Sequence, residues 1–227
     1  NRGAAGARNA GVEAAAGEFI AFLDSDDQWE QDYLTLQVAA LEAQPDCSFI
    51  FCDHKEILRN GKTVVFQYKT LAQYRDLVHR SLTNIFIYTM STVIARRAAM
   101  EAVGYLNETL DICHDRELYI RLLSAGNMAH MPRPLVTRIL HDGNMSADYH
   151  SWAKYVFMTL DIFFASEQGQ AYKDLEPQIR SDWAMSIGHT VWQTEKDLWT
   201  YLWMGVKAAT AAPRLTAKYI QNKLRPV

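Results

Sequence analysis

Residues 18–29 read Glu-Phe-Ile-Ala-Phe-Leu-Asp-Ser-Asp-Asp-Gln-Trp, and the interpretation of the whole chain depends on this stretch. Its first part, Phe19–Leu23, is almost wholly apolar, which predicts a strand buried on both faces, as in a parallel sheet. Three carboxylates follow directly: Asp24, Asp26 and Asp27. Because open α/β sheets bind ligands outside the carboxyl ends of their strands, we expect a binding site here.

The three carboxylates predict a divalent metal site. Like charges this close resist ionising together, and a bound cation relieves their repulsion. Carboxylate oxygens are hard ligands that favour Mg²⁺, Mn²⁺ or Ca²⁺. A calcium loop of the EF-hand type is excluded, because Gln28 and Trp29 occupy its fifth and sixth positions, where an acidic residue or Asn and then Gly are required.

Two other interpretations of this stretch stay open. Asp is a favoured residue at helix N-termini, so Asp27 would simply cap the helix that follows. Phosphatases with a nucleophilic Asp also carry Asp-x-Asp after an apolar strand. The match to them is poor, because Gln28 stands where they have Thr or Val.

The composition is that of an ordinary globular protein. The 227 residues are 49% hydrophobic and 22% charged, and the formal charge of −3 gives no sign of nucleic-acid binding. Three cysteines without paired metal spacing are expected to be reduced thiols. No signal peptide or transmembrane run is evident, which predicts a cytoplasmic location.

Hydrophobic periodicity predicts alternating helices and strands over the first two thirds of the chain. A hairpin is expected over 56–67, with Asn60-Gly61 as its turn. The predicted helices are 4–16, 31–43, 71–82, 98–103 and one that opens at Asp115, and the predicted strands are 19–23, 48–52, 91–95, 128–131 and 135–140.

The start of the chain adds a second motif. Residues 1–11 read Asn-Arg-Gly-Ala-Ala-Gly-Ala-Arg-Asn-Ala-Gly. Followed by Gly17 and Phe22-Leu23-Asp24-Ser25-Asp26-Asp27, this order of motifs closely resembles the inverting family 2 glycosyltransferases. The resemblance implies a GT-A-like, Rossmann-like mixed sheet flanked by helices.

The resemblance also implies roles for the acidic stretch. Asp24 and Asp26, with Asp27 as a further member, would hold Mg²⁺ or Mn²⁺ on the diphosphate of a nucleotide-sugar. Arg8 would lie at the nucleotide.

A second acidic site is predicted at residues 113–126, where Cys113-His114-Asp115 precedes an amphipathic helix. Taken alone, Asp115 is a residue that the helix dipole favours at an N-terminus. In the family, Glu-Asp stands before such a helix and the Asp is the catalytic base, which the resemblance implies for Asp115. His114 takes the usual place of the Glu. A protonated His114 would weaken Asp115 as a base, and a neutral one would not.

The resemblance extends to residues 138–146, where Arg138, His141, Asn144 and Ser146 correspond to the Arg, His, Asn and Ser of the family's Tyr-Arg-x-His-x-x-Asn-x-Ser pattern. It implies a loop over the donor phosphates, with Arg138 and His141 among the contacts. The alternative is a polar turn without a ligand.

Family members begin with a strand, a helix and an acidic loop that binds base and ribose, upstream of the motif found at Asn1. We therefore expect an N-terminally truncated domain with an exposed apolar sheet edge. Weak or no nucleotide binding by this chain alone is the predicted consequence.

Residues 147–227 predict a helical extension to a domain of residues 1–146. Helices are expected near 152–164, over 175–192 and 198–209, and from Pro213 to Leu224. From Lys207 onward there are five basic and no acidic residues, and several Trp residues precede them. These features predict either association with the inner face of a membrane or an ordinary helical cap.

The expected function is inverting transfer of a hexose from a UDP-, GDP- or dTDP-sugar to a glycan or lipid-linked acceptor, in polysaccharide biosynthesis for the cell envelope. The alternative is a non-catalytic fragment, scaffold or partner protein with a degenerate donor site, suggested by His114 and by the missing nucleotide half.

Overall fold

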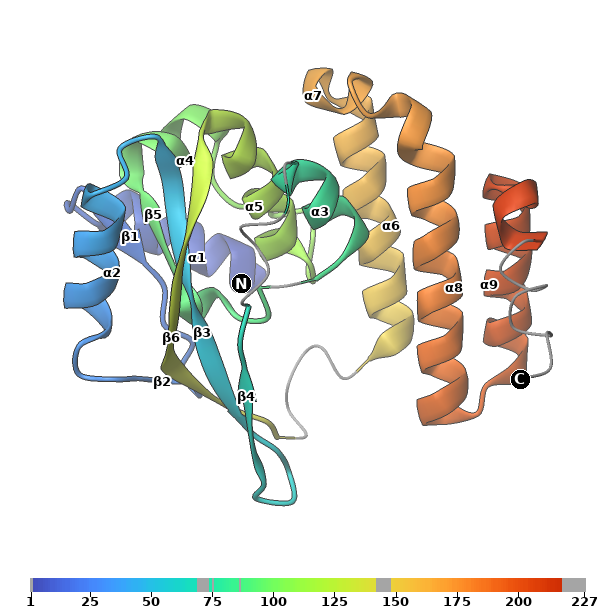
Figure 1. Ribbon diagram of the computed structural model, residues 1–227, viewed down its shortest axis with the longest axis horizontal. Helices are drawn as coiled ribbons and strands as arrows, with labels where there is room; N and C mark the ends of the chain where they lie inside the picture. The colour runs from blue at the N-terminus through green and yellow to red at the C-terminus, as the bar shows by residue number, and fades with distance from the viewer. Residues whose placement is uncertain (1, 69–73, 75, 86, 142–147, 218–227) are drawn as a thin grey trace. The chain divides into compact units, whose positions relative to one another are not determined.

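The computed structural model describes residues 2–68, 74, 76–85, 87–141 and 148–217. The chain divides into two compact units, residues 1–147 and 148–227. The first is built on a mixed sheet and the second is helical (Figure 1).

The sheet of the first unit has strand order β1-β5-β3-β6-β2, with β4 paired to the outer half of β3. β3 and β6 run parallel, and the other pairs are antiparallel. This confirms the predicted GT-A-like mixed sheet. The strands are β1 Phe19–Ala21, β2 Gln28–Trp29, β3 Cys47–Ile57, β4 Thr63–Phe66, β5 Val93–Arg96 and β6 Asn127–Ile139.

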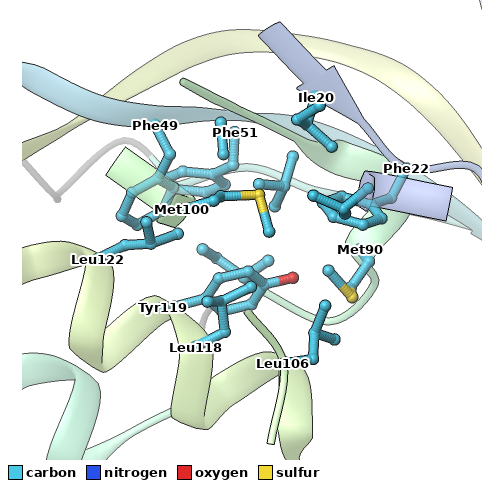
Figure 2. Close-up of a cluster of buried hydrophobic side chains, with 14 of the residues drawn as sticks. Ile20, Phe22, Phe49, Phe51, Met90, Met100, Leu106, Leu118, Tyr119 and Leu122 are labelled. Atoms are coloured by element: carbon cyan, nitrogen blue, oxygen red, sulfur yellow. The ribbon is translucent and has the colours of Figure 1, made fainter. Parts of the chain in front are cut away.

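Helices cover both faces of this sheet, because the central strand β3 alternates its apolar side chains between them. Phe49 and Phe51 pack with α1, α4 and α5 (Figure 2), whereas Ile50 and Cys52 pack with α2. All four side chains are fully buried. The helices are α1 Gly3–Ala14, α2 Tyr33–Glu42, α3 Leu77–Thr83, α4 Arg97–Val103 and α5 His114–Ala125, with a 3-10 turn η2 at Met90–Thr92.

The prediction of a doubly buried parallel strand over Phe19–Leu23 is wrong. β1 ends at Ala21, pairs antiparallel with β5 and stands at one end of the strand order. Leu23, which is 51% exposed, already belongs to the loop that carries the carboxylates. A run of apolar residues reveals neither the direction of the neighbouring strand nor whether the strand lies at the end of the sheet.

Two further strand predictions need correction. Residues 128–131 and 135–140 form one strand, β6, in place of two. Pro132 and Pro134 are accommodated where the pairing of β3 with β6 shifts register near Asp53. Pro is tolerated in sheets at such irregularities. β3 likewise continues past the predicted end at Cys52 into the hairpin with β4.

The other elements that were predicted for the first unit lie within a few residues of their predicted ranges, whereas the short strand β2 was not predicted. The helix predicted over 71–82 begins at Leu77, after the cap residue Asp76. Its predicted first turn, residues 71–73 and 75, lies outside the described residues. The hairpin turn is where Asn60-Gly61 predicted it, with Gly61 at a φ of 77° that favours glycine.

The second unit confirms the predicted helical extension. Its long helices pack through buried apolar side chains, among them Val156, Leu160, Ile187 and Met204. The predicted last helix is present over 213–217, and its continuation to Leu224 lies outside the described residues. The helices are α6 Tyr149–Ala165, α7 Glu167–Gln170, α8 Glu176–Glu195 and α9 Leu198–Ala211, with a 3-10 turn η4 at Lys173–Leu175.

Within the described residues, no helix has the length and apolar character needed to cross a bilayer. Cys47, Cys52 and Cys113 are buried free thiols, as predicted.

Candidate functional site

A cavity of about 310 Å³ opens in the first unit beside the ends of β1 and β6 and the start of α5. It is lined by most of the residues that the sequence singled out. Residues more than 100 positions apart in the chain thus face one space. The lining residues are Arg8, Asp24, Ser25, Asp26, Asp27, Tyr88, Thr89, Met90, Ile112, Cys113, His114, Asp115 and Arg138.

Asp24 is the first residue of the acidic loop and contacts both the side chain of Arg8 and the side chain of Ser91 in η2. Its Oδ1 forms a short ion pair with Nη2 of Arg8, which projects from α1. Its backbone N–H donates to Oγ of Ser91 at 3.0 Å. Trp29 Nε1 donates to the Ser91 carbonyl at 2.8 Å, so both ends of the loop are anchored on η2.

Asp27 is buried and does not cap a helix, so the capping interpretation is wrong. α2 begins at Tyr33, six residues further on, with Asp32 before it. Thr89 donates a hydrogen bond of 2.7 Å to Oδ2 of Asp27. Burial raises the pKa of Asp27, although hydrogen bonds from Ser91 and Thr89 act against the rise. Asp27 therefore ionises less readily than an ordinary aspartate.

Asp26 has the opposite character. Its Oδ2 lies 2.8 Å from Nε2 of His141, which follows the end of β6. This hydrogen bond is the main reason why the pKa of Asp26 is lowered. Asp26 and His141, which were both predicted to bind the sugar donor, therefore contact each other. His141 itself does not line the cavity.

Asp115 lies in the first turn of α5, where its Oδ1 accepts the Arg116 backbone N–H at 2.7 Å. His114, directly before it, is 3% exposed. Its Nε2 lies 2.6 Å from Nη1 of Arg8, and its Nδ1 lies 3.2 Å from the Leu110 carbonyl oxygen. A guanidinium only donates and a carbonyl only accepts, so Nδ1 carries the single ring proton. His114 is neutral in this arrangement.

Arg138, on β6, lines the cavity and is bonded to a buried carboxylate. Its Nη1 donates at 2.9 Å to Oε1 of Glu56, which is directly opposite it in the parallel pairing of β3 with β6. His54 Nε2 reaches the same Glu56 oxygen at 3.4 Å. Burial works against ionisation of Glu56, yet hydrogen bonds from His54 and Arg138 lower its pKa overall.

The carboxylates offer hard oxygen donors to a divalent cation, which is the donor chemistry that Mg²⁺ and Mn²⁺ prefer. In the described part of the chain, however, no three His, Cys, Asp or Glu side chains cluster closely enough to form a ready-made metal site. Asp24 pairs with Arg8, Asp26 contacts His141, and Asp27 accepts from Thr89, whose hydroxyl also lies 3.4 Å from Asp24. The carboxylates therefore fit a divalent cation as ligands. A metal at this loop would need further ligands, such as phosphate oxygens or water, to complete its coordination.

Sequence reasoning missed several residues of the cavity and Glu56, which is bonded to the cavity residue Arg138. Thr89 and Tyr88 precede a predicted strand, and only their hydroxyl groups beside a carboxylate cluster would have drawn attention to them. Glu56 lay in a stretch interpreted as a variable hairpin, and nothing in the local sequence distinguishes it from a surface residue.

Comparison with known proteins relates the first unit to a protein family. A family model described as Glycosyl transferase family 2 matches residues 1–104. A curated relative from Escherichia coli, the UDP-Glc:alpha-D-GlcNAc-diphosphoundecaprenol beta-1,3-glucosyltransferase WfgD, is 36% identical over 95 residues, which is 42% of this chain and 36% of that enzyme. The chain spans about a third of the length of the curated relatives that it matches first.

Solved structures show the same fold. TarS of S. aureus, residues 1–349, superposes with a TM-score of 0.60 at 16% identity, over 94% of this chain and 62% of that one. The mannosyltransferase PcManGT from Pyrobaculum calidifontis, solved in complex with GDP-Man and Mn²⁺, gives a TM-score of 0.54 at 16% identity, over 96% and 63% of the two chains. Residues 1–104, which carry the acidic loop and Arg8, are thus the part of this chain that is similar to glycosyl transferase family 2.

Proposed function

We propose that this chain transfers a sugar from a nucleotide-sugar to a glycan or lipid-linked acceptor with inversion at the anomeric carbon. The observation that carries the proposal is the single cavity shared by Asp115, Asp24 and Asp26, with Arg8 and Arg138 in its wall. Two acidic groups with different surroundings are what such a transfer requires, one at the attacking oxygen and one at the leaving group.

In the proposed reaction the acceptor hydroxyl attacks the anomeric carbon as Asp115 accepts its proton. The new carbon–oxygen bond forms while the bond to the diphosphate breaks, and the nucleoside diphosphate leaves with the electron pair. Arg8 and Arg138 would stabilise the negative charge that develops on the phosphates. The neutral state of His114 suits this role of Asp115, because a positively charged ring beside the carboxylate would make it a weaker base.

Asp24 and Asp26 are the residues that would hold Mg²⁺ or Mn²⁺, with Asp27 as a further candidate. The metal, when bound, supplies Lewis-acid stabilisation of the leaving diphosphate. The Mn²⁺ in the solved mannosyltransferase supports this assignment. The donor nucleotide is proposed to be UDP, GDP or dTDP.

The test is a screen for transfer and for hydrolysis of UDP-, GDP- and dTDP-sugars, with and without Mn²⁺. Asp115→Asn should lower the rate by roughly 10²–10⁴-fold, because the hydroxyl loses its proton acceptor. Asp46→Asn is the matched control, since Asp46 is exposed in the turn before β3 and does not line the cavity. An Asp115→Asn variant as active as the wild type would refute the assigned base.

The competing proposal is a non-catalytic scaffold or partner protein with a degenerate donor site. It draws support from the Arg8–Asp24 pair, which occupies one of the carboxylates needed for a metal. This alternative would be favoured if the chain turned over no donor in the screen but still bound a glycan.

We further propose a cytoplasmic location on the inner face of a membrane. The support is a row of exposed apolar side chains along α9, here called the α9 stripe. Trp199, its most exposed member, is 81% accessible. The basic residues from Lys207 onward suit an anionic lipid surface. The stripe consists of Leu198, Trp199, Leu202, Trp203 and Val206.

A further inference from the structure

We infer that Glu56 is a positioning residue of the donor site, which holds the guanidinium of Arg138 in place to bind the diphosphate of the nucleotide-sugar. The inference rests on the proposed function and adds a residue that neither the family motifs nor the sequence pattern pointed to. It assigns Glu56 no contact with substrate.

The buried carboxylate of Glu56 bonds Arg138, which lines the cavity. Glu56 is 6% exposed and receives Arg138 Nη1 at 2.9 Å. The two residues are register partners on the parallel strands β3 and β6, so their side chains leave the sheet on the same face. Arg138 reaches the cavity from this position, whereas Glu56 does not line it.

A second contact fixes the carboxylate itself. His54 is fully buried two residues earlier on β3, with Nε2 at 3.4 Å from Glu56. The His54 ring stacks on Phe66 of β4 at 4.8 Å between centroids with an interplanar angle of 6°. Glu56 thus belongs to a packed layer in the β3–β4 hairpin, which limits the orientations available to it.

An arginine side chain is long and has many rotamers, and holding it in one orientation costs conformational entropy. A buried carboxylate opposite it removes much of this cost before the ligand arrives, because the charge-assisted bond selects one orientation. A guanidinium presents five N–H donors, and the bond to Glu56 uses one of them. Ordering the side chain before binding raises the affinity, because less conformational entropy is lost when the ligand binds.

The experiment measures binding of inorganic pyrophosphate with Mg²⁺ to the whole chain by calorimetry. Pyrophosphate probes the phosphate subsite without depending on recognition of base or ribose. We compare the wild type with Glu56→Gln, Arg138→Ala and the double variant, and we record thermal unfolding of each.

The control variant is Asp53→Asn. Asp53 is a buried carboxylate on the same strand and is 1% exposed. Its Oδ1 lies 2.7 Å from Nε2 of His130, and Asp53 does not line the cavity. It matches Glu56 in burial and in histidine contact but has no arginine to position. A loss of affinity that merely reflects damage to β3 would therefore appear in Asp53→Asn as well.

Glu56→Gln should weaken binding about tenfold, the size expected for one hydrogen bond to a charged group. The double variant should bind no more weakly than Arg138→Ala, because Glu56 acts through Arg138. Asp53→Asn should bind like the wild type. If Glu56→Gln does not fold, Glu56→Asp keeps the charge, shortens the side chain and should weaken binding in the same direction.

The outcomes separate this inference from the proposed function. If the wild type binds and Glu56→Gln binds equally well, the inference is overturned and the proposed function stands. Additive losses in the double variant also overturn it, since Glu56 would then act independently of Arg138. If the wild type does not bind the probe, the phosphate subsite is refuted and the inference with it.

Discussion

At the scale of single residues, the short motif Arg8-Asn9 serves two separate purposes. Arg8 faces the cavity and joins Asp24 to His114. Asn9 is 5% exposed and points into the protein, where its amide pairs with both backbone groups of Leu106 at 2.9 Å. Neighbouring residues on a helix point in different directions, so a functional and a structural residue can stand side by side.

Asn9→Ala should destabilise the protein by roughly 2–4 kcal/mol, because it leaves the buried N–H and C=O of Leu106 without this partner. Chemical denaturation followed by circular dichroism measures the change. Asn107→Ala is the control, since its amide accepts the N–H of Thr109 in an exposed turn. Equal stability of the Asn9 variant and the wild type would contradict this account of the motif.

At the scale of elements, the ends of the helices and strands decide what reaches the cavity. α5 begins at His114, after Cys113 has adopted a left-handed conformation with a φ of 64°. This turn places His114 and Asp115 at the start of the helix and in the cavity wall. A second left-handed residue, Lys196 with a φ of 56°, ends α8. Glycine is the residue that adopts this conformation without a Cβ penalty.

Lys196→Gly should therefore stabilise the chain by about 0.5–1 kcal/mol, as relief of the left-handed strain outweighs the greater freedom of the unfolded chain. Lys196→Ala provides the comparison, because it removes the charge and the contact with Trp192 but keeps the Cβ atom. The thermal midpoints of the two variants are measured side by side. A Gly variant no more stable than the Ala variant would show that Lys196 is not strained.

At the scale of the whole molecule, the chain joins two units with different surfaces. The first carries the polar cavity. The second carries the α9 stripe, whose apolar side chains are exposed although the opposite side of α9 packs on α8 through Met204 and Ala208. Lys207 lies over the rings of Trp203 and Phe157 at 4.2 and 4.6 Å, so a positive charge borders the stripe. Aromatic side chains beside basic ones are typical of helices that lie in a membrane interface.

If the α9 stripe binds membranes, the chain should float with vesicles that contain anionic phospholipid and should bind neutral vesicles weakly. Higher salt should reduce the binding, because the attraction of each basic residue is screened. Trp199→Ala with Trp203→Ala should lower the bound fraction about tenfold or more, since two large apolar groups no longer insert.

Leu175→Ala is the matched control for vesicle binding, as Leu175 is an exposed apolar residue outside α9. Absence of flotation of the wild type with either kind of vesicle would refute the membrane proposal.

The sequence by itself was sufficient for the resemblance to the family and for the type of fold. The order of Arg8, Asn9, Gly17 and the acidic loop is local information, and family motifs are recognised from local spacing. Periodicity found most helices because amphipathic burial repeats along one element. It failed at Phe19–Leu23 and at the two supposed strands around Pro132, because strand direction and register depend on neighbours that are remote in the chain.

Only the tertiary structure decided how the residues of the candidate site meet. Arg8 and His114 are separated by 106 positions, and Glu56 and Arg138 by 82. The proton position on His114 and the carboxylate behind Arg138 follow from these contacts. Hydrogen bonds and ion pairs act over a few ångströms, and the folded path of the backbone alone determines which side chains come that close.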